Sequence, residues 1–197
     1  AVEAFARPGG VQTNRWRVLY LSRLAPKKNL EALIDAMPLL TDALAQVELR
    51  IVGDGDPAYV AALKARAQAL RGRASISWGG HLEGEDKARE LAEAGVFALP
   101  SHSENFGIAA AEALAAGLPC LLGRGVAIAG SVVDAAAGFA VDPDPEAIAD
   151  GLRRIIREAP RRELMAANAR ALAEREFSLQ AMGKRLVQLY ADILQQR

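Results

Sequence analysis

Short apolar runs alternate with amphipathic helical segments along most of the chain, and this alternation constrains the fold more than any other feature. Six runs are predicted as buried strands: residues 17–22, 47–53, 75–78, 96–100, 118–122 and 138–141. Helical patterns lie between or after them: about 30–40, from 57, 87–93, 106–116, from 145, 161–176 and 179–195. Strands and helices in this order form a parallel sheet that helices cover. The sequence therefore predicts an α/β fold, a Rossmann-like parallel sheet with helices on both faces.

The composition excludes several classes of protein. The 197 residues carry 24 Lys and Arg against 24 Asp and Glu, so the formal net charge is zero. A neutral chain lacks the basic surface that binds nucleic acid or anionic membranes, and no nucleic-acid partner is predicted. One Cys and two His are too few for a disulfide framework or a Cys/His zinc site. The first residues do not resemble a signal peptide, and no apolar stretch is long enough to span a membrane. The sequence therefore predicts a cytoplasmic location.

Polar residues follow four of the predicted strands at the points where the strands end. In strand order they are Arg23 and Lys28, then residues 53–55 (GDG), 79–81 (GGH) and 101–107 (SHSENFG). In an open parallel sheet, ligands bind beyond the carboxyl ends of the strands. Glycines, cations and the carboxylate of Glu104 at one edge therefore predict a site for a polar, anionic small molecule.

Glu112 is the only charged residue in the otherwise apolar helix 106–116. A helix that is apolar on every face is expected to be buried, and a lone carboxylate there is costly unless it has partners. Those partners are either structural, such as an arginine or a backbone group, or the hydroxyls of a ligand, which we favour. At the start of this helix, free N–H groups and the helix dipole attract anions, and Gly107 allows close approach. Arg23 and Lys28 would supply the positive charge that a diphosphate needs.

Three other motifs have weaker support. Residues 53–58 (GDGDPA) match the dinucleotide fingerprint G-x-G-x-x-A, but they follow the second strand, and no acid lies about 20 residues further on. Residues 142–144 (DPD) resemble a metal-binding D-x-D motif, but Asp144 and Pro145 are better explained as the start of a helix. Residues 101–103 (SHS) suggest a hydrolase, but no G-x-S-x-G motif accompanies them. No metal site is predicted.

Residues 104–119 (ENFGIAAAEALAAGLP) resemble the paired-glutamate signature of the family 4 (group 1) retaining glycosyltransferases, which have the two-domain GT-B architecture. Residues 22–29 (SRLAPKKN) are similar to that family's G-R-L-x-x-x-K-G segment, although Ser22 and Asn29 replace its glycines. VGDG, WGGHL and LPS follow in the family's order, at 52–55, 78–82 and 99–101. Residues 125–129 (GVAIA) stand where many members carry two glycines and a glutamate.

The resemblance implies three catalytic residues, Arg23, Lys28 and Glu104. Arg23 and Lys28 would neutralise the donor diphosphate and stabilise the leaving nucleotide, while Glu104 would hold the transferred sugar. The implied reaction is transfer of a sugar from a nucleoside-diphosphate sugar to an acceptor hydroxyl, with retention. It would need no metal or other cofactor, because the stabilised charge on the diphosphate drives its departure.

The resemblance also implies six donor-binding residues: Gly80, His81, Phe106, Gly107, Ile108 and Glu112. Glu112 would bind the ribose hydroxyls. The backbone of residues 106–108 would help Glu104 to hold the sugar, and the backbone near residues 80 and 81 would meet the base.

The enzymes of this family have two such domains, and this chain resembles the C-terminal, donor-binding half. We expect residues 1–14 to be a remnant of the interdomain linker, 15–177 the nucleotide-sugar-binding Rossmann-like domain, and 178–197 a helix that crosses back to an N-terminal acceptor-binding domain. The expected partners are that domain and the nucleotide-sugar donor. Any peripheral membrane association would involve only that domain. The chain alone is expected to be inactive. Two alternatives are a nucleotide-sugar-binding scaffold without transferase activity and a sugar-nucleotide epimerase of the same architecture.

Overall fold

The computed structural model describes residues 16–40, 47–157 and 159–195. A six-stranded sheet in the order β3-β2-β1-β4-β5-β6 forms its centre, and every pair of neighbouring strands is parallel. The strands are β1 (Trp16–Leu21), β2 (Val47–Val52), β3 (Ser75–Gly80), β4 (Val96–Leu99), β5 (Cys120–Gly123) and β6 (Gly138–Val141). The predicted α/β fold is confirmed. The predicted linker remnant, residues 1–14, lies outside the described residues.

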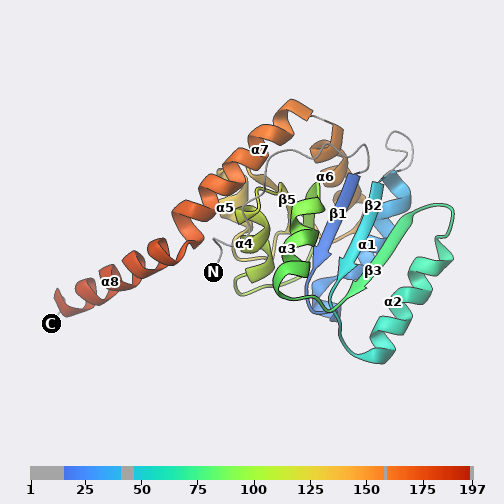
Figure 1. The fold of residues 1–197 in the computed structure, drawn as a ribbon, viewed down its shortest axis with the longest axis horizontal. Helices are drawn as coiled ribbons and strands as arrows, with labels where there is room; N and C mark the ends of the chain where they lie inside the picture. The colour runs from blue at the N-terminus through green and yellow to red at the C-terminus, as the bar shows by residue number, and fades with distance from the viewer. Residues whose placement is uncertain (1–15, 41–46, 158, 196–197) are drawn as a thin grey trace.

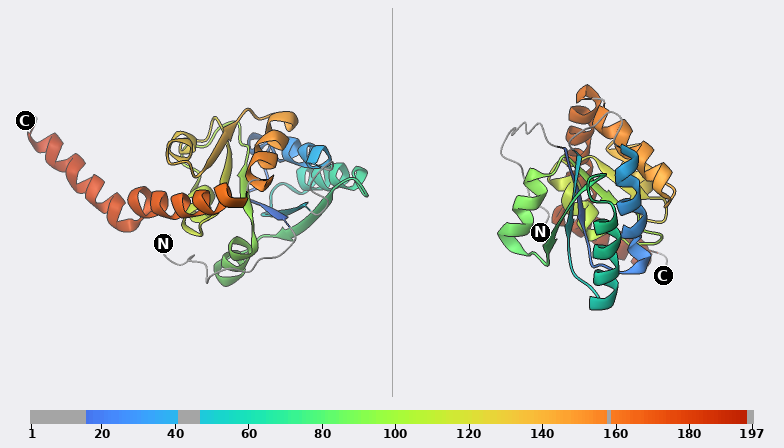
Figure 2. Two further views of the ribbon diagram at one scale, coloured as in Figure 1. Left: turned by 90° about the horizontal axis from the view of Figure 1, so that it is seen from above. Right: turned by 90° about the vertical axis from the view of Figure 1, so that its right-hand side faces the viewer.

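Helices cover both faces of the sheet (Figure 1). One face carries α1 (Leu30–Ala36), α2 (Pro57–Ala69) and α6 (Pro145–Arg157), and α1 contacts both of the others. The opposite face carries α3 (Gly84–Glu93) and α4 (Ile108–Ala115), and the right-hand view of Figure 2 shows the sheet between α3 and the pair α1 and α2. The central strands are therefore buried on both sides, which is why β4 and β5 are continuous apolar runs.

Several helix boundaries differ from the sequence prediction. The first helix ends at Ala36 and continues as a 3-10 turn, η3 (Met37–Leu40), because Pro38 has no N–H to continue the α-helical hydrogen bonds. α4 begins at Ile108 rather than 106, because Gly107 adopts a left-handed conformation. α3 begins three residues earlier than predicted, at Gly84. The short helix α5 (Ala129–Asp134) was not predicted, because the residues around it show no clear helical periodicity.

The C-terminal part of the chain packs against the α4 side and then leaves the body. α7 (Ala159–Leu172) contacts α4 and α5, and a π-helix, η4 (Ala173–Phe177), follows directly. α8 (Leu179–Gln195) projects away from the sheet (Figure 1). Seven of its apolar side chains are 48% to 71% exposed: Leu179, Met182, Leu186, Val187, Tyr190, Ile193 and Leu194. Within the described ranges, no helix is both long enough and apolar enough to cross a membrane.

Candidate functional site

Backbone hydrogen bonds tie together the loops at the carboxyl ends of the strands. We call these loops, residues 22–29, 53–56, 80–83, 100–107 and 124–127, the carboxyl rim. The bonds run from Gly53 N to Gly80 O (2.7 Å), Leu24 N to Asp54 O (2.7 Å), His102 N to Lys27 O (3.0 Å) and Glu104 N to Gly125 O (3.1 Å). Each bond joins loops that follow neighbouring strands, so the rim is continuous from β3 to β5. The structure thus gathers the polar segments at one edge of the sheet.

The glycine-rich motif at residues 53–58 is explained by packing within the rim. Gly53 has a φ of +139°, and a Cβ at this position would overlap the carbonyl oxygen of Ser22. The Asp56 carboxylate accepts a hydrogen bond from the Tyr59 backbone N–H at 3.0 Å and so caps the start of α2. An anionic group of the protein already occupies this helix terminus, which disfavours the dinucleotide interpretation of the motif.

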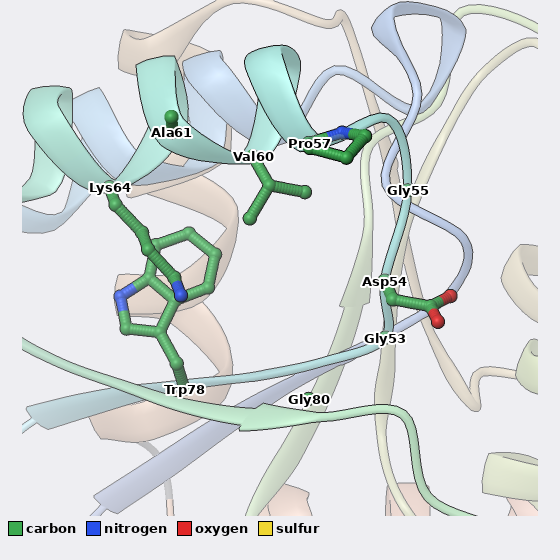
Figure 3. Close-up of a pocket in the computed structure, with 9 residues that line it drawn as sticks. All are labelled: Gly53, Asp54, Gly55, Pro57, Val60, Ala61, Lys64, Trp78 and Gly80. Atoms are coloured by element: carbon green, nitrogen blue, oxygen red, sulfur yellow. The ribbon is translucent and has the colours of Figure 1, made fainter.

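A pocket of about 370 Å³ opens between α2 and β3, beside this motif (Figure 3). Its apolar wall includes Val60 and the ring of Trp78, and the Lys64 ammonium lies 5.7 Å from the centre of that ring. In Figure 3 the carboxylate of Asp54 points away from Trp78. Gly80 is the only predicted site residue among those that line this pocket, so the predicted site has its centre elsewhere on the rim.

Lys28 and Glu104 form an ion pair within the carboxyl rim. Lys28 ends the 3-10 turn η2 (Pro26–Lys28), and Glu104 lies in the loop after β4. Their side chains are only 11% and 12% exposed, and charges so far removed from water require a partner. An ammonium group has three donors, so Lys28 keeps hydrogen-bonding capacity for a second anion. The structure therefore brings together two of the three predicted catalytic residues.

Glu112 accepts a hydrogen bond from Lys87 across the gap between α4 and α3. The Lys87 Nζ–Glu112 Oε1 distance is 2.7 Å, and the two side chains are 22% and 15% exposed. Of the two kinds of partner considered for Glu112, the structure supplies a structural one, a lysine from the neighbouring helix rather than an arginine. The sequence does not point to Lys87, because a lysine in an amphipathic surface helix carries no functional signal of its own.

The amino terminus of α4 lies between the two glutamates and has no side-chain cap. Gly107 is the N-cap residue, and its φ of +89° is a conformation that L side chains rarely adopt. Ile108, the first helical residue, is 70% exposed, and Phe106 is 38% exposed. The expectation that this helix is buried on every face is therefore wrong at its start, and burial begins at Ala110. The exposed start leaves backbone N–H groups accessible to an anion.

Arg23, Gly80 and His81 lie on the rim outside these two ion pairs. The Arg23 side chain is exposed, and no ion pair involves it within the described part of the chain. Gly80 has a φ of +67° and open space where a Cβ would stand. His81 is exposed; its Nε2 lies 3.0 Å from Glu83 Oε1, and its Nδ1 lies 4.0 Å from Asp54 Oδ1. The structure places these residues at the same edge without connecting them to either lysine–glutamate pair.

Asn29 stands where the G-R-L-x-x-x-K-G segment of the glycosyltransferase family ends in a glycine, and its backbone conformation suits that position. Its φ is +55°, a left-handed conformation that asparagine tolerates better than most residues. Its side-chain amide donates to the carbonyl oxygens of Pro100 (3.2 Å) and Pro143 (2.8 Å). Asn29 therefore ties the loop after β1 to the segments that follow β4 and β6, which a glycine could not do.

Asp144 and Pro145 mark the start of α6, as the sequence predicts. The Asp144 carboxylate accepts a hydrogen bond from the Ala147 N–H at 2.8 Å, and Asp142 pairs with Arg124 at 3.0 Å. Across the residues that the structure describes, no three His, Cys, Asp or Glu side chains are grouped so that they could hold a metal ion.

Comparison with known sequences connects this geometry to one family. Residues 2–172 match the family described as "Glycosyl transferases group 1". A GDP-mannose-dependent monoacylated alpha-(1-6)-phosphatidylinositol monomannoside mannosyltransferase of Corynebacterium glutamicum is 33% identical over 176 residues, 85% of this chain and 45% of the relative. Phosphatidyl-myo-inositol mannosyltransferase of Mycobacterium tuberculosis is 30% identical over 195 residues, 95% of this chain and 50% of the relative. The chain spans about half the length of these curated relatives.

Solved structures agree with this assignment. The crystal structure of HepE from Anabaena in complex with UDP-glucose matches with a TM-score of 0.78 and 26% identity, and the match covers 91% of this chain and 49% of HepE. The C-terminal domain of a glycosyl transferase group 1 family protein (LpcC) from Francisella tularensis matches with a TM-score of 0.81, over 90% of this chain and 98% of that domain. Its sequence identity of 19% supports the fold alone.

Proposed function

The chain belongs to the group 1 glycosyltransferase family, and we propose that it is the donor-binding half of a retaining, metal-independent hexosyltransferase. It would bind a nucleoside-diphosphate sugar at the carboxyl rim and pass the sugar to an acceptor hydroxyl held by a second domain. One observation carries the proposal: the ion pairs Lys28–Glu104 and Lys87–Glu112 flank the uncapped start of α4. This arrangement offers cations, carboxylates and free N–H groups within one small region.

The diphosphate would lie between Lys28, Arg23 and the start of α4. Lys28 uses one of its donors on Glu104, which leaves others for a phosphate oxygen. Arg23 is exposed and can present two parallel N–H groups to a second phosphate oxygen. Negative charge grows on the diphosphate as its bond to the anomeric carbon breaks, and donors already fixed in place stabilise that charge.

The two glutamates would hold the sugar and the ribose. Glu104 lies beside the exposed residues Phe106 and Ile108, and we assign it, with the backbone of residues 106–108, to the transferred sugar. Lys87 donates a hydrogen bond to one carboxylate oxygen of Glu112. The other oxygen can therefore accept hydrogen bonds from ribose hydroxyls. The open space over Gly80, next to His81, would receive the base.

The exposed apolar residues of α8 support the prediction that this helix crosses to an acceptor-binding domain. A helix that leaves the body with seven apolar side chains 48% to 71% exposed needs a partner surface. The half-length match to the curated relatives supports the same conclusion. We place the complete enzyme in the cytoplasm, with any contact to the inner face of the membrane made by the other domain. A scaffold without transferase activity would share this donor site but would show no turnover when joined to the acceptor domain.

Calorimetric titration of the chain with UDP, GDP, ADP and their sugar conjugates tests the proposal. We expect one base to bind, and ligand at 100-fold its Kd should raise the unfolding free energy by about 2.7 kcal/mol. Arg23→Ala and Lys28→Ala should each weaken nucleoside diphosphate binding by roughly tenfold, because a hydrogen bond between charged groups is lost, and should leave nucleoside binding nearly unchanged.

Lys27→Ala is the matched control, because it removes a neighbouring exposed lysine from the same turn. No binding of any of these nucleotides at millimolar concentration would contradict the donor site. Equal losses for nucleoside and diphosphate would show that the variants are misfolded. Sugar transfer by the chain alone would contradict the two-domain arrangement.

A further inference from the structure

The unit formed by α7 and η4 holds α4 at both of its ends. At the carboxyl end, Gly117 has a φ of +73°, and a Cβ there would overlap the guanidinium of Arg170 from α7. At the amino end, the ring of Phe106 meets the ring of Phe177, the last residue of η4, with the ring centroids 5.5 Å apart and the ring planes at 89°. The helix that carries Glu112 is therefore fixed from outside the sheet by C-terminal residues.

Phe177 is built into the body, whereas Phe106 lies at the surface. Phe177 is 5% exposed and Phe106 is 38% exposed. The edge-to-face geometry is the favoured arrangement of two aromatic rings. Phe177 also ends a π-helix, a rare element that is frequent at functional sites. A fixed ring thus holds the position of a ring that solvent would otherwise leave mobile.

The segment from Glu104 to Ile108 has few other anchors. Glu104 is held by its ion pair with Lys28 and by backbone hydrogen bonds to Gly125 (3.1 Å) and from Ala127 (3.0 Å), but these contacts end at Glu104. Gly107 follows, with a φ of +89°. Because glycine has no Cβ, its backbone is more flexible than that of any other residue. The contact of the Phe106 ring with Phe177 is therefore a side-chain anchor within residues 105–108, close to the backbone N–H groups at the start of α4.

We propose that Phe177 is a positioning residue of the donor-sugar subsite, which acts through Phe106 on the N–H groups of residues 106–108. This inference rests on the proposed function, because it assumes that those N–H groups meet the sugar and its diphosphate. Phe177 lies in none of the motifs that identify the donor site, and it is 65 residues away from Glu112 in the sequence. It contributes no hydrogen bond of its own and changes only the geometry of the loop.

Calorimetric titration with a nucleoside, which lacks the phosphates and the donor sugar, and with the nucleoside-diphosphate sugar of the same base tests this role. Phe177→Leu keeps the core filled and removes the aromatic edge. An aromatic pair of this kind corresponds to roughly a twofold to tenfold change in an equilibrium constant. We therefore expect Phe177→Leu to weaken binding of the diphosphate sugar within that range and to leave binding of the nucleoside unchanged.

A double-mutant cycle separates positioning from general destabilisation. Phe106→Leu, Phe177→Leu and the double variant should show the same loss, because either single change removes the whole contact. The control Leu172→Ala removes a fully buried side chain from α7, five residues before Phe177, and should weaken both ligands equally or neither. Additive losses, or a Phe177→Leu variant that binds the diphosphate sugar normally, would overturn the inference.

Hydrogen exchange of the ligand-free chain keeps this test independent of the proposed function. Phe177→Leu should speed exchange at the N–H groups of residues 106–108 more than Leu172→Ala does. Unchanged exchange there would overturn the positioning role even if the chain binds nucleotides. Failure of the wild-type chain to bind any nucleotide sugar, together with faster exchange in the variant, would reject the donor site and retain Phe177 as the residue that orders this loop.

Discussion

α3 and α4 lie on the same face of the sheet, joined by Lys87 and Glu112, but different forces hold them in place (Figure 1). α4 packs through small apolar side chains, and Ala110, Ala113 and Leu114 are completely buried. Of the ten residues of α3, only Glu90 and Leu91 are buried. The two halves of the proposed nucleotide site therefore rest on helices of opposite character.

α3 is held to the sheet largely by ion pairs, because Leu91 is its only buried apolar residue. Glu90 Oε1 accepts hydrogen bonds from the Arg50 guanidinium at 2.9 and 2.5 Å, and Glu93 accepts one from Arg17 at 2.5 Å. Apolar contacts are non-directional and change little at moderate salt, whereas the partly exposed pair Glu93–Arg17 depends on both geometry and salt. On the proposed assignment, the diphosphate and sugar would therefore lie against a helix held by apolar packing, and the base would lie beside a helix held largely by ion pairs.

The largest expected effect comes from the apolar packing of α4. Leu114→Ala should lower the unfolding free energy by about 2–5 kcal/mol, the usual cost of a cavity in a well-packed core. Urea unfolding followed by circular dichroism measures it. Ile108→Ala in the same helix is the control and should change little, because Ile108 is 70% exposed. A loss below about 1 kcal/mol for Leu114→Ala would show that α4 is not held as described.

A smaller effect is expected from the ion pairs of α3. Glu90→Gln keeps the shape of the side chain but removes its charge, and should cost about 1.5–3 kcal/mol, the contribution of a hydrogen bond between charged groups. Denaturant melts in low and high salt measure it, and the loss should change little with salt, because Glu90 is buried. Glu85→Gln, an exposed glutamate on the same helix, is the control. Equal losses in the two variants would contradict a supporting role for Glu90.

The bridge between the two helices should matter for binding and little for stability. Glu112→Ala should change the unfolding free energy by no more than about 1 kcal/mol, because Lys87 can turn to solvent and alanine favours the helix. Nucleotide binding should weaken roughly tenfold, the value of a lost charged hydrogen bond. The variant should also no longer distinguish ribose from 2′-deoxyribose. Lys87→Met, which leaves the carboxylate in place, should keep that distinction.

Comparing the unfolding free energy of Glu112→Ala, from denaturant melts, with its nucleotide affinity, from titrations, decides the role of Glu112. A Glu112→Ala variant that is strongly destabilised but binds nucleotide normally would make Glu112 a structural residue only.

The smallest effect expected is a difference in local motion. Raising the salt concentration from about 0.05 to 0.5 M shortens the screening length and should speed hydrogen exchange in α3 by a few-fold, while α4 changes less. Mass spectrometry of peptides that cover residues 84–93 and 108–115 measures both helices in one sample. Equal responses would remove the contrast between the two helices.

The sequence predicts the fold well, because burial on both faces leaves continuous apolar strands, and these stand out between amphipathic helices. It also predicts that Arg23, Lys28 and Glu104 belong to one edge, since each lies in a segment that follows a strand. Lys87 could not be predicted from its own segment, which resembles any exposed helix. Its contact with Glu112 exists only because the strand order places α3 beside α4.

The sequence does not predict a role for Phe177, for a related reason. A phenylalanine near the end of a predicted helix is ordinary core material, and its partner Phe106 lies 71 residues earlier. Likewise, Gly107 adopts a left-handed conformation, which moves the start of α4 from 106 to 108, and a Cβ there would stand 3.2 Å from Val126. Such contacts depend on tertiary neighbours, and no local pattern encodes them.

The hydrogen bonds of the carboxyl rim join main-chain atoms, from Gly53 and Gly80 through to Glu104 and Gly125. Main-chain atoms are the same in every residue, so most side chains on the rim can be exchanged without loosening it. Over evolutionary time, such a frame lets descendants of one ancestor drift toward new substrates one residue at a time, with the frame inherited intact. The same property makes residues such as Arg23 and His81 suitable positions for laboratory libraries that seek altered donor preference.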